Sequence, residues 1–274
     1  MLEQTLSDKV AIVSGSDTGI GASICTELSS RGVTVVVNCP FHSLLSKAMN
    51  VCSSLSSKSI AVETDLSTVD GPKRLINETV KQFGRIDILV NNAGLAVNKQ
   101  FEDQTLEDWD LLVNLNGRGT FLLTQNVFKY LPEEGGRIVN IVSISAREAP
   151  AMHTIYAGTK GMVDSFTKVW TKELSPKYGC TVNVVSPGPT ITDGFAQAGE
   201  ELMKKLQPVI DKTSVGKRLG KPEEIAFAVA FLCEVTTESD HCRGKSLLPQ
   251  LYPLPETHIL YHIPRHKAFQ SLKH

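Results

Sequence analysis

The chain has 274 residues, of which 41% are hydrophobic, and this length fits one large α/β domain with a sizeable core. Its 28 lysines and arginines nearly balance its 29 aspartates and glutamates, without a long run of one sign, so neither a nucleic acid nor an anionic membrane surface is an expected partner. A small ligand with little or no charge is expected instead.

The cysteines and the N-terminal residues predict a reduced, cytoplasmic protein. No CxxC pair occurs, and no apolar stretch approaches the roughly 20 residues of a membrane span. The first residues lead directly into an apolar run and lack the pattern of a signal peptide. The six cysteines are Cys25, Cys39, Cys52, Cys180, Cys233 and Cys242.

Short apolar runs rich in β-branched residues alternate with longer segments of helical period, which predicts βαβ units around a buried parallel sheet. Right-handed crossovers then place helices on both faces, so a doubly wound, Rossmann-like α/β fold is expected. Six strands are predicted, at residues 10–15, 33–38, 59–65, 87–94, 137–143 and 181–188. The clearest helices are predicted at residues 106–131, 154–177 and 222–234.

The stretch "SGSDTGIG" follows the first predicted strand and places glycines at Gly15, Gly19 and Gly21. Glycines allow a tight turn and a close approach of the backbone to a pyrophosphate, which the amino end of the following helix would hold. The spacing GxxxGxG differs from the commoner GxGxxG, and a purely structural turn is the alternative.

The end of the second predicted strand bears on the choice of nucleotide. It reads Asn38, Cys39 and Pro40, and it has no carboxylate that would bind ribose hydroxyls and repel a 2′-phosphate. NADP is therefore favoured over NAD. NAD stays a competing cofactor, because Thr18 is not basic and Asp17 lies nearby.

Several motifs in the same order resemble the short-chain dehydrogenase/reductase family over residues 6–234. They are "SGSDTGIG", Asp65 after the third strand, "NNAG", an asparagine in the next helix, a serine ending the fifth strand, Tyr-x-x-x-Lys and "PGPTITD". The segments "VNLNGRGTFLLTQ" and "NIVSIS" are most similar to carbonyl reductases of polyketide and related secondary metabolism. The resemblance implies hydride transfer between NADP(H) and a carbonyl or secondary alcohol.

The resemblance also assigns cofactor contacts. The glycine turn would face the phosphates and the adenosine. The residues after the third strand would contact the adenine. The residues after the sixth strand would contact the nicotinamide with its carboxamide and phosphate. The implied cofactor-binding residues are Gly15, Asp17, Gly19, Ile20, Gly21, Asp65, Leu66, Asn92, Ala93, Gly94, Tyr156, Lys160, Pro187, Gly188, Thr190 and Thr192.

Tyr156 and Lys160 are four residues apart, so on a helix both side chains project from one face. A lysine ammonium beside the phenol is expected to lower the tyrosine pKa from about 10 and to make Tyr156 a general acid or base. An ordinary solvated helix face is the alternative for this pair taken alone. By resemblance, Lys160 also holds the nicotinamide ribose.

Ser143 and Asn116 complete the implied catalytic set. Ser143 ends the fifth predicted strand and would hydrogen-bond the substrate oxygen. Asn116 would hold a water that connects Lys160 to solvent. Ser145 and Asn114 are the competing positions, and the family's spacing favours Ser143 and Asn116.

Residues 190–220 are expected to form a substrate lid, and residues 149–155 the opposite wall. No basic residue there demands an anionic substrate, so a ketone, an enone or a quinone-like phenolic compound is expected. The side chains of the lid that could face the pocket are Phe195, Met203, Leu206 and Ile210.

The C-terminal residues depart from the family. Residues 1–236 are interpreted as the dinucleotide-binding and catalytic domain, and residues 237–274 as an atypical tail. Prolines disfavour a central strand there, which puts the family's seventh strand and its homo-oligomer in doubt. His258, His262 and His266 recur every four residues, yet Pro264 interrupts the helix that a metal site would need, so no metal is expected. Oxidation of an alcohol, or nucleotide binding without turnover, are the alternative functions.

Overall fold

The computed structural model describes residues 5–192, 207–208, 210–211, 218–234 and 258–260. Within them a sheet has the strand order β3-β2-β1-β4-β5-β6-β7, and its first six strands are parallel. Each of these six overlaps a predicted strand. The parallel strands are β1 (Val10–Val13), β2 (Thr34–Cys39), β3 (Ser59–Glu63), β4 (Ile88–Asn91), β5 (Gly136–Ile141) and β6 (Cys180–Ser186).

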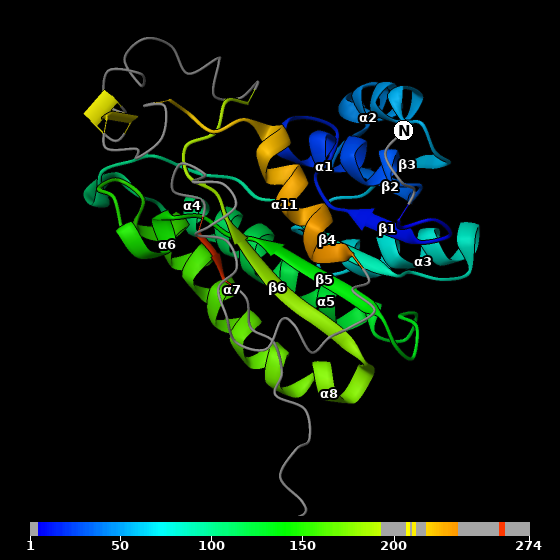
Figure 1. Ribbon diagram of the computed structural model, residues 1–274. Coiled ribbons are helices and arrows are strands. Elements are labelled where there is room, and N and C mark those ends of the chain that lie inside the picture. Colours follow the sequence, from blue (N-terminus) through cyan, green and yellow to red (C-terminus); the bar gives the residue numbers. More distant parts are fainter. Residues whose placement is uncertain (1–4, 193–206, 209, 212–217, 235–257, 261–274) are drawn as a thin grey trace, which may run out of the picture.

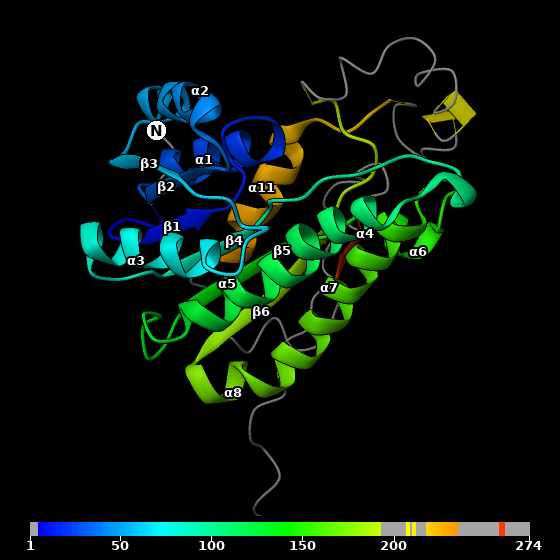
Figure 2. The same cartoon turned by 180° about the vertical axis from the view of Figure 1, so that it is seen from behind.

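Helices cover both faces of the sheet, as a doubly wound fold requires (Figures 1 and 2). One apolar cluster joins a sheet face to α1 and α11, with α2 at its side, and a second joins the other face to α3, α5 and α7. The longer helices are α1 (Gly19–Ser30), α2 (His42–Ser54), α3 (Gly71–Phe83), α4 (Leu106–Leu112), α5 (Thr120–Val127), α7 (Thr154–Glu173) and α11 (Pro222–Cys233). The short ones are the 3-10 turn η1 (Phe101–Asp103), α6 (Ser145–Glu148) and α8 (Ser175–Tyr178).

The strand order places a topological switch between β1 and β4. The chain moves outward from β1 through β2 to β3, and α3 then returns it to β4 on the other side of β1. The loops that leave the carboxyl ends of β1 and β4 therefore diverge, and a crevice opens between them.

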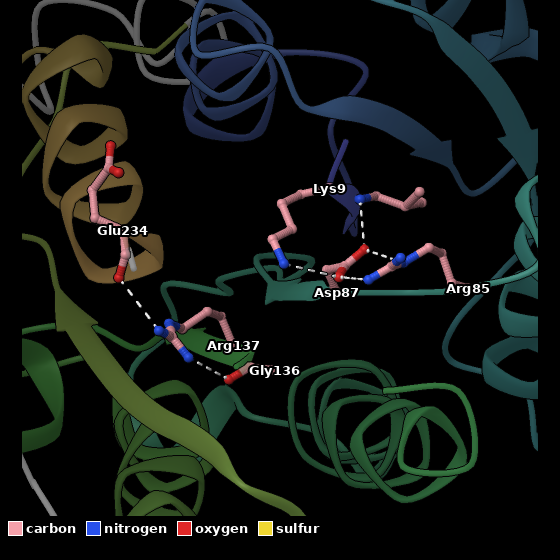
Figure 3. Close-up of polar contacts among 7 residues, drawn as sticks. Lys9, Arg85, Asp87, Gly136, Arg137 and Glu234 are labelled. Carbon is pink, nitrogen blue, oxygen red and sulfur yellow. Dashed lines mark hydrogen bonds and ion pairs between the residues drawn. The ribbon is translucent and has the colours of Figure 1, made fainter. Parts of the chain in front are cut away.

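A buried carboxylate fixes β1 against β4 at the amino ends of these strands, opposite the crevice. Asp87 is fully buried and accepts a hydrogen bond of 3.0 Å from the backbone N–H of Val10. Arg85 donates two hydrogen bonds to the same carboxylate, and Lys9 lies 3.5 Å from it (Figure 3). Because a buried carboxylate is stable only when it is paired, this group holds the amino ends of the two strands together.

The helix predicted over residues 106–131 is divided in three. Between α4 and α5 the chain forms a π-helix, η2 (Val113–Gly119), in which each turn holds an extra residue. The segment is helical as predicted as far as Val127, but it is not one regular α-helix. Apolar periodicity does not reveal the π-helix, because the chain stays helical on both sides of it.

A short seventh strand, β7 (His258–Leu260), is present at the edge of the sheet and pairs antiparallel to β6. The sequence left such a strand in doubt. The edge position agrees with the expectation that prolines keep this part of the chain out of a central strand. The remainder of residues 237–274 lies outside the described residues.

Candidate active site

A cavity of about 760 Å³ lies at the carboxyl ends of the parallel strands, where the strand order reverses. Loops that follow β1 to β6 all contribute to its wall. Of the predicted site residues, seventeen line it: Gly15, Asp17, Gly19, Ile20, Gly21, Asp65, Leu66, Asn92, Ala93, Gly94, Ser143, Tyr156, Lys160, Pro187, Gly188, Thr190 and Thr192.

The glycine turn has the backbone that a pyrophosphate site needs. Gly15 and Gly19 have φ values of 56° and 59°, in the left-handed region that disfavours other residues. A Cβ at Gly21 would lie 2.5 Å from the carbonyl oxygen of Gly15 and 2.6 Å from Nδ2 of Asn92. The first turn of α1 follows at once and contains no acidic residue, so its free N–H groups suit a phosphate anion. The residues present fit a dinucleotide.

Two asparagines hold this turn in place. Asn38, near the end of β2, accepts a hydrogen bond of 3.0 Å from the N–H of Gly15. Asn92 donates from Nδ2 to the carbonyls of Ser14 and Gly15, at 2.9 and 2.8 Å. The sequence shows Asn38 as a position without a carboxylate, but it does not reveal this structural role. Its place in the strand next to β1 was the available signal.

The nucleotide end of the cavity carries one buried acid. Asp17 is 9% exposed, and burial raises the pKa of its carboxyl, although its own backbone N–H and Lys47 act in the opposite direction. At the end of β3, Glu63 pairs with His42 across 2.9 Å. No cation adjoins Asp17 closely enough to form an ion pair within the part of the chain that the structure describes.

The phenol of Tyr156 lies on α7 and faces Ser143. Burial raises the pKa of Tyr156, and a hydrogen bond with the Ser143 hydroxyl lowers it in part. The expectation that Lys160 lowers this pKa was therefore wrong. The ammonium lies 5.9 Å from the centre of the Tyr156 ring and instead donates a hydrogen bond of 2.9 Å to the carbonyl of Ile141.

Lys160 is itself a buried cation. It is 5% exposed, and burial lowers its pKa to about 8. Its Nζ lies against the loop after β4. A Cβ added at Gly94 in this loop would be 3.1 Å from Nζ and 3.2 Å from Oδ1 of Asn116. Glycine at this position thus leaves room for Lys160 and Asn116 on the same side of the loop.

We expect the ionisation of Lys160 to appear in the stability of the protein without cofactor. Between pH 8 and 10.5 the unfolded chain holds a proton that folded Lys160 has lost, so unfolding becomes less favourable as the pH rises through this window. The shift corresponds to about 3 kcal/mol. Urea unfolding gives the free energy of unfolding of wild type and of Lys160→Met at pH 7.5 and at pH 10. The effect is the change with pH in the difference between the two proteins. The ionisation of buried thiols is common to both and cancels in this difference. A difference that stays constant with pH would contradict the assignment.

Asn116 lies in η2, directly behind the cavity wall. Its side chain accepts a hydrogen bond of 2.9 Å from the N–H of Leu95 and donates to the carbonyl of Leu95 and to Oγ1 of Thr159, at 2.9 and 3.0 Å. Thr159 comes from α7, between Tyr156 and Lys160 in the chain. Asn116 therefore joins the loop after β4 to the helix that carries the tyrosine and the lysine. The contact of Asn116 with Thr159 was not predicted from the sequence.

Ser145 and His153 contact Ser143 and Tyr156. The N–H of Ser145 donates to Oγ of Ser143 across 3.1 Å, and Oγ of Ser145 lies 3.3 Å from Nδ1 of His153. The imidazole ring contacts the Tyr156 ring edge to face, with 5.6 Å between the ring centres, and burial lowers the pKa of His153. His153 belongs to the predicted substrate wall, whereas most of the predicted lid, with Phe195, Met203 and Leu206, lies outside the described residues.

Two further findings concern the described part of the chain. No helix there has both the length and the apolar character to cross a membrane. No group of three or more histidine, cysteine, aspartate or glutamate side chains is placed there to hold a metal ion. His262 and His266 lie outside this part.

Comparison with known proteins gives one consistent result. The short chain dehydrogenase family profile matches residues 9–202. The chain is 37% identical to a short-chain dehydrogenase/reductase FrzI of Cladobotryum sp, over 84% of this chain and 90% of the relative. It is 32% identical to the hydroxynaphthalene reductase arp2 of Aspergillus fumigatus, over 91% of this chain and 94% of the relative. A short chain dehydrogenase from Burkholderia cenocepacia, solved in complex with NADP, superposes with a TM-score of 0.77 at 30% identity, covering 84% of this chain and 92% of that one.

Proposed function

Because the chain belongs to the short-chain dehydrogenase family of oxidoreductases, we propose that it reduces a carbonyl group of a small organic molecule with NADPH. The observation that carries this proposal is the meeting of Ser143, Tyr156 and Lys160 in the same cavity as the glycine turn. A nucleotide and a carbonyl could thus share one enclosed space, and residues 1–236 would form the unit that performs the reaction.

NADP is the cofactor that we propose, with NAD as its competitor. The glycine turn and the amino end of α1 would hold the pyrophosphate, Asp65 and Leu66 the adenine, and Pro187 and Gly188 the nicotinamide. No carboxylate follows β2 that would repel a 2′-phosphate. The NADP complex of the Burkholderia cenocepacia relative supports the same choice.

The nicotinamide, when bound, supplies a hydride to the carbonyl carbon. Tyr156 donates the proton that the carbonyl oxygen needs, and the Ser143 hydroxyl hydrogen-bonds this oxygen as negative charge develops. Ser145 and His153 keep Ser143 and the Tyr156 ring in position. Lys160 replaces the proton on Tyr156, and Asn116, bonded to Leu95 and Thr159, would hold a water that connects Lys160 to solvent.

The ionisation of Tyr156 favours reduction over the reverse reaction. Since burial raises its pKa, the phenol is neutral at physiological pH and is ready to act as an acid. Oxidation of an alcohol, the second candidate, requires the phenolate and would proceed best at alkaline pH. Nucleotide binding without turnover is the third candidate.

An uncharged aromatic ketone is the substrate class that we propose. Apolar side chains of Leu95, Ala96, Leu111 and Leu115 line the cavity beside the polar groups. Two of the similar proteins are a hydroxynaphthalene reductase and a hydroxynaphthalene reductase-like protein, which supports a quinone-like or phenolic ring ketone of secondary metabolism. A cytoplasmic location and a homo-oligomeric state remain part of this proposal.

A substrate panel tests the proposed function. NADPH oxidation is followed by absorbance with aliphatic ketones, cyclic enones, tetralones and quinones, and each rate is compared with that of NADH. The expected result is reduction of fused-ring ketones with a preference for NADPH. Binding of NADPH without turnover of any compound, in either direction, would favour the nucleotide-binding protein instead.

We expect Asp17→Asn to tighten the binding of NADPH. A carboxylate at the nucleotide end of the cavity repels a 2′-phosphate by about 1 kcal/mol, so its removal should raise the affinity roughly fivefold. Calorimetric titration with adenosine 2′,5′-bisphosphate and with 5′-AMP measures the effect, which should be larger for the bisphosphate. Glu63→Gln, which removes an exposed carboxylate paired with His42, is the matched control. Equal gains for both ligands would contradict the role of Asp17 in nucleotide choice.

A further inference from the structure

The π-helix η2 touches two opposite parts of the cavity. Asn116 exchanges hydrogen bonds with the backbone of Leu95, beside the catalytic side chains. Two residues later, Arg118 donates a hydrogen bond from Nη2 to the carbonyl of Ser67. Ser67, Asp65 and Leu66 line the cavity in the turn after β3, which we call the adenosine turn. One seven-residue segment thus contacts both ends of the site.

The adenosine turn rests directly on the backbone of this helix. A Cβ at Gly119 would lie 2.6 Å from the carbonyl oxygen of Leu66, so no side chain fits between the turn and η2. Within the turn, the N–H of Ser67 donates to Oδ1 of Asp65 across 2.8 Å. A movement of the turn toward η2 must therefore displace η2 as well.

The contact made by Arg118 lowers the stability of the folded protein. Its Nε is buried and has no hydrogen-bond partner among the described residues, and no carboxylate there forms an ion pair with its guanidinium. A buried donor without a partner costs stability, and such exceptions call for a reason other than stability. The direction of the side chain, toward the adenosine turn, supplies one.

We infer that Arg118 is a positioning residue that couples the adenosine turn to Asn116, so that filling the adenosine end of the cavity fixes the asparagine in its working position. This inference rests on the proposed function, because it takes Asn116 as part of the proton path. Arg118 touches neither the reacting atoms nor the proton path itself. It acts through the π-helix, whose looser turns can shift while α4 and α5 stay packed.

The coupling is measured first without catalysis. Hydrogen–deuterium exchange is recorded for wild type, Arg118→Met and Arg118→Lys, each with and without adenosine 2′,5′-bisphosphate. In wild type the ligand should slow the exchange of the Leu95 amide and of residues 113–119 at least threefold. Arg118→Met should lose this response at saturating ligand, and Arg118→Lys, which keeps one donor, should retain part of it.

Arg137→Met is the matched control for loss of a half-buried arginine. Arg137 also donates to backbone carbonyls, those of Gly136 at 3.0 Å and Glu234 at 3.4 Å (Figure 3), and it is not among the residues that line the cavity. Its removal should leave the exchange response intact. If Arg118→Met responds to the ligand as wild type does, the coupling through Arg118 is overturned.

Kinetics then separate coupling from a general loss of structure. With NADPH and the best substrate of the panel, Arg118→Met should lower kcat about tenfold, and Arg137→Met less than twofold. Combined with Asn116→Ala, Arg118→Met should add no further loss of kcat, because both changes act on one group. Additive losses would overturn the inference. A wild type that turns over no substrate but shows the exchange response would overturn the proposed function and leave the coupling standing.

Discussion

Replacement of Tyr156 by phenylalanine is expected to lower kcat for carbonyl reduction by about 10³-fold, within the range that a positioned general acid contributes. The phenol is the acidic group that lines the cavity beside Ser143, and burial keeps it protonated at neutral pH. Phenylalanine fills the same space on α7, so the affinity for NADPH should stay within about threefold. Stopped-flow measurement of NADPH oxidation and a fluorescence titration with NADPH separate the two quantities.

Tyr178→Phe is the control for the loss of a tyrosine hydroxyl. Tyr178 ends α8 and stacks on Phe128, with 4.6 Å between the ring centres, away from the residues that line the cavity. This variant should keep wild-type activity. If Tyr156→Phe retained more than a tenth of the wild-type kcat, another group would be the proton donor, and the half-buried His153 beside Tyr156 would be the next to test.

The sheet was predictable because its strands are buried on both faces. Residues 33–37, for example, are all β-branched and four of them are valine, as is typical of a parallel sheet covered by helices. The crossover rule then placed helices on both faces, whereas the strand order and the register were not predicted. The strand β7 was not predictable, because it pairs antiparallel to β6 and lies far from β6 in the sequence.

The residues that line the cavity were predictable by resemblance, but the directions of their pKa shifts were not. Spacing places Tyr156 and Lys160 on one face of α7, but it does not say that Ile141 offers its carbonyl to the ammonium. That contact holds Lys160 away from the phenol and lets burial dominate both groups. Burial depends on the loops after β4 and β5, which no local pattern in α7 records.

The π-helix shows a second limit of sequence. Residues 113–119 read as ordinary helix, and Asn116 alone is no more than a polar residue in it. Its bonds to Leu95 and Thr159 exist because η2 packs against α7 and against the loop after β4. Gly117 is a local signal of the packing against α7, since a Cβ there would lie 2.0 Å from Cε of Met162.

Gly21→Ala is expected to abolish the binding of NADPH and to destabilise the protein by about 2 kcal/mol. The added methyl group would lie 2.5 Å from the Gly15 carbonyl oxygen, 2.6 Å from Nδ2 of Asn92 and 2.7 Å from Cα of Ser16, and two of these three atoms are backbone. Relief requires the turn to move away from α1, and the phosphate site moves with it. Calorimetric titration with NADPH and urea unfolding measure the two effects.

Gly158→Ala makes the same chemical change where there is room for it. Gly158 is an exposed helical residue between Tyr156 and Lys160 in the chain, and a Cβ there meets nothing within 4 Å among the described residues. Alanine should stabilise α7 by about 1 kcal/mol and leave NADPH affinity unchanged. If both variants bound NADPH as wild type does, the glycine turn would not hold the pyrophosphate. If Gly158→Ala lost this binding as well, a methyl group added where there is room would have the same effect, and the clash of Gly21 with Gly15 and Asn92 would not explain the loss.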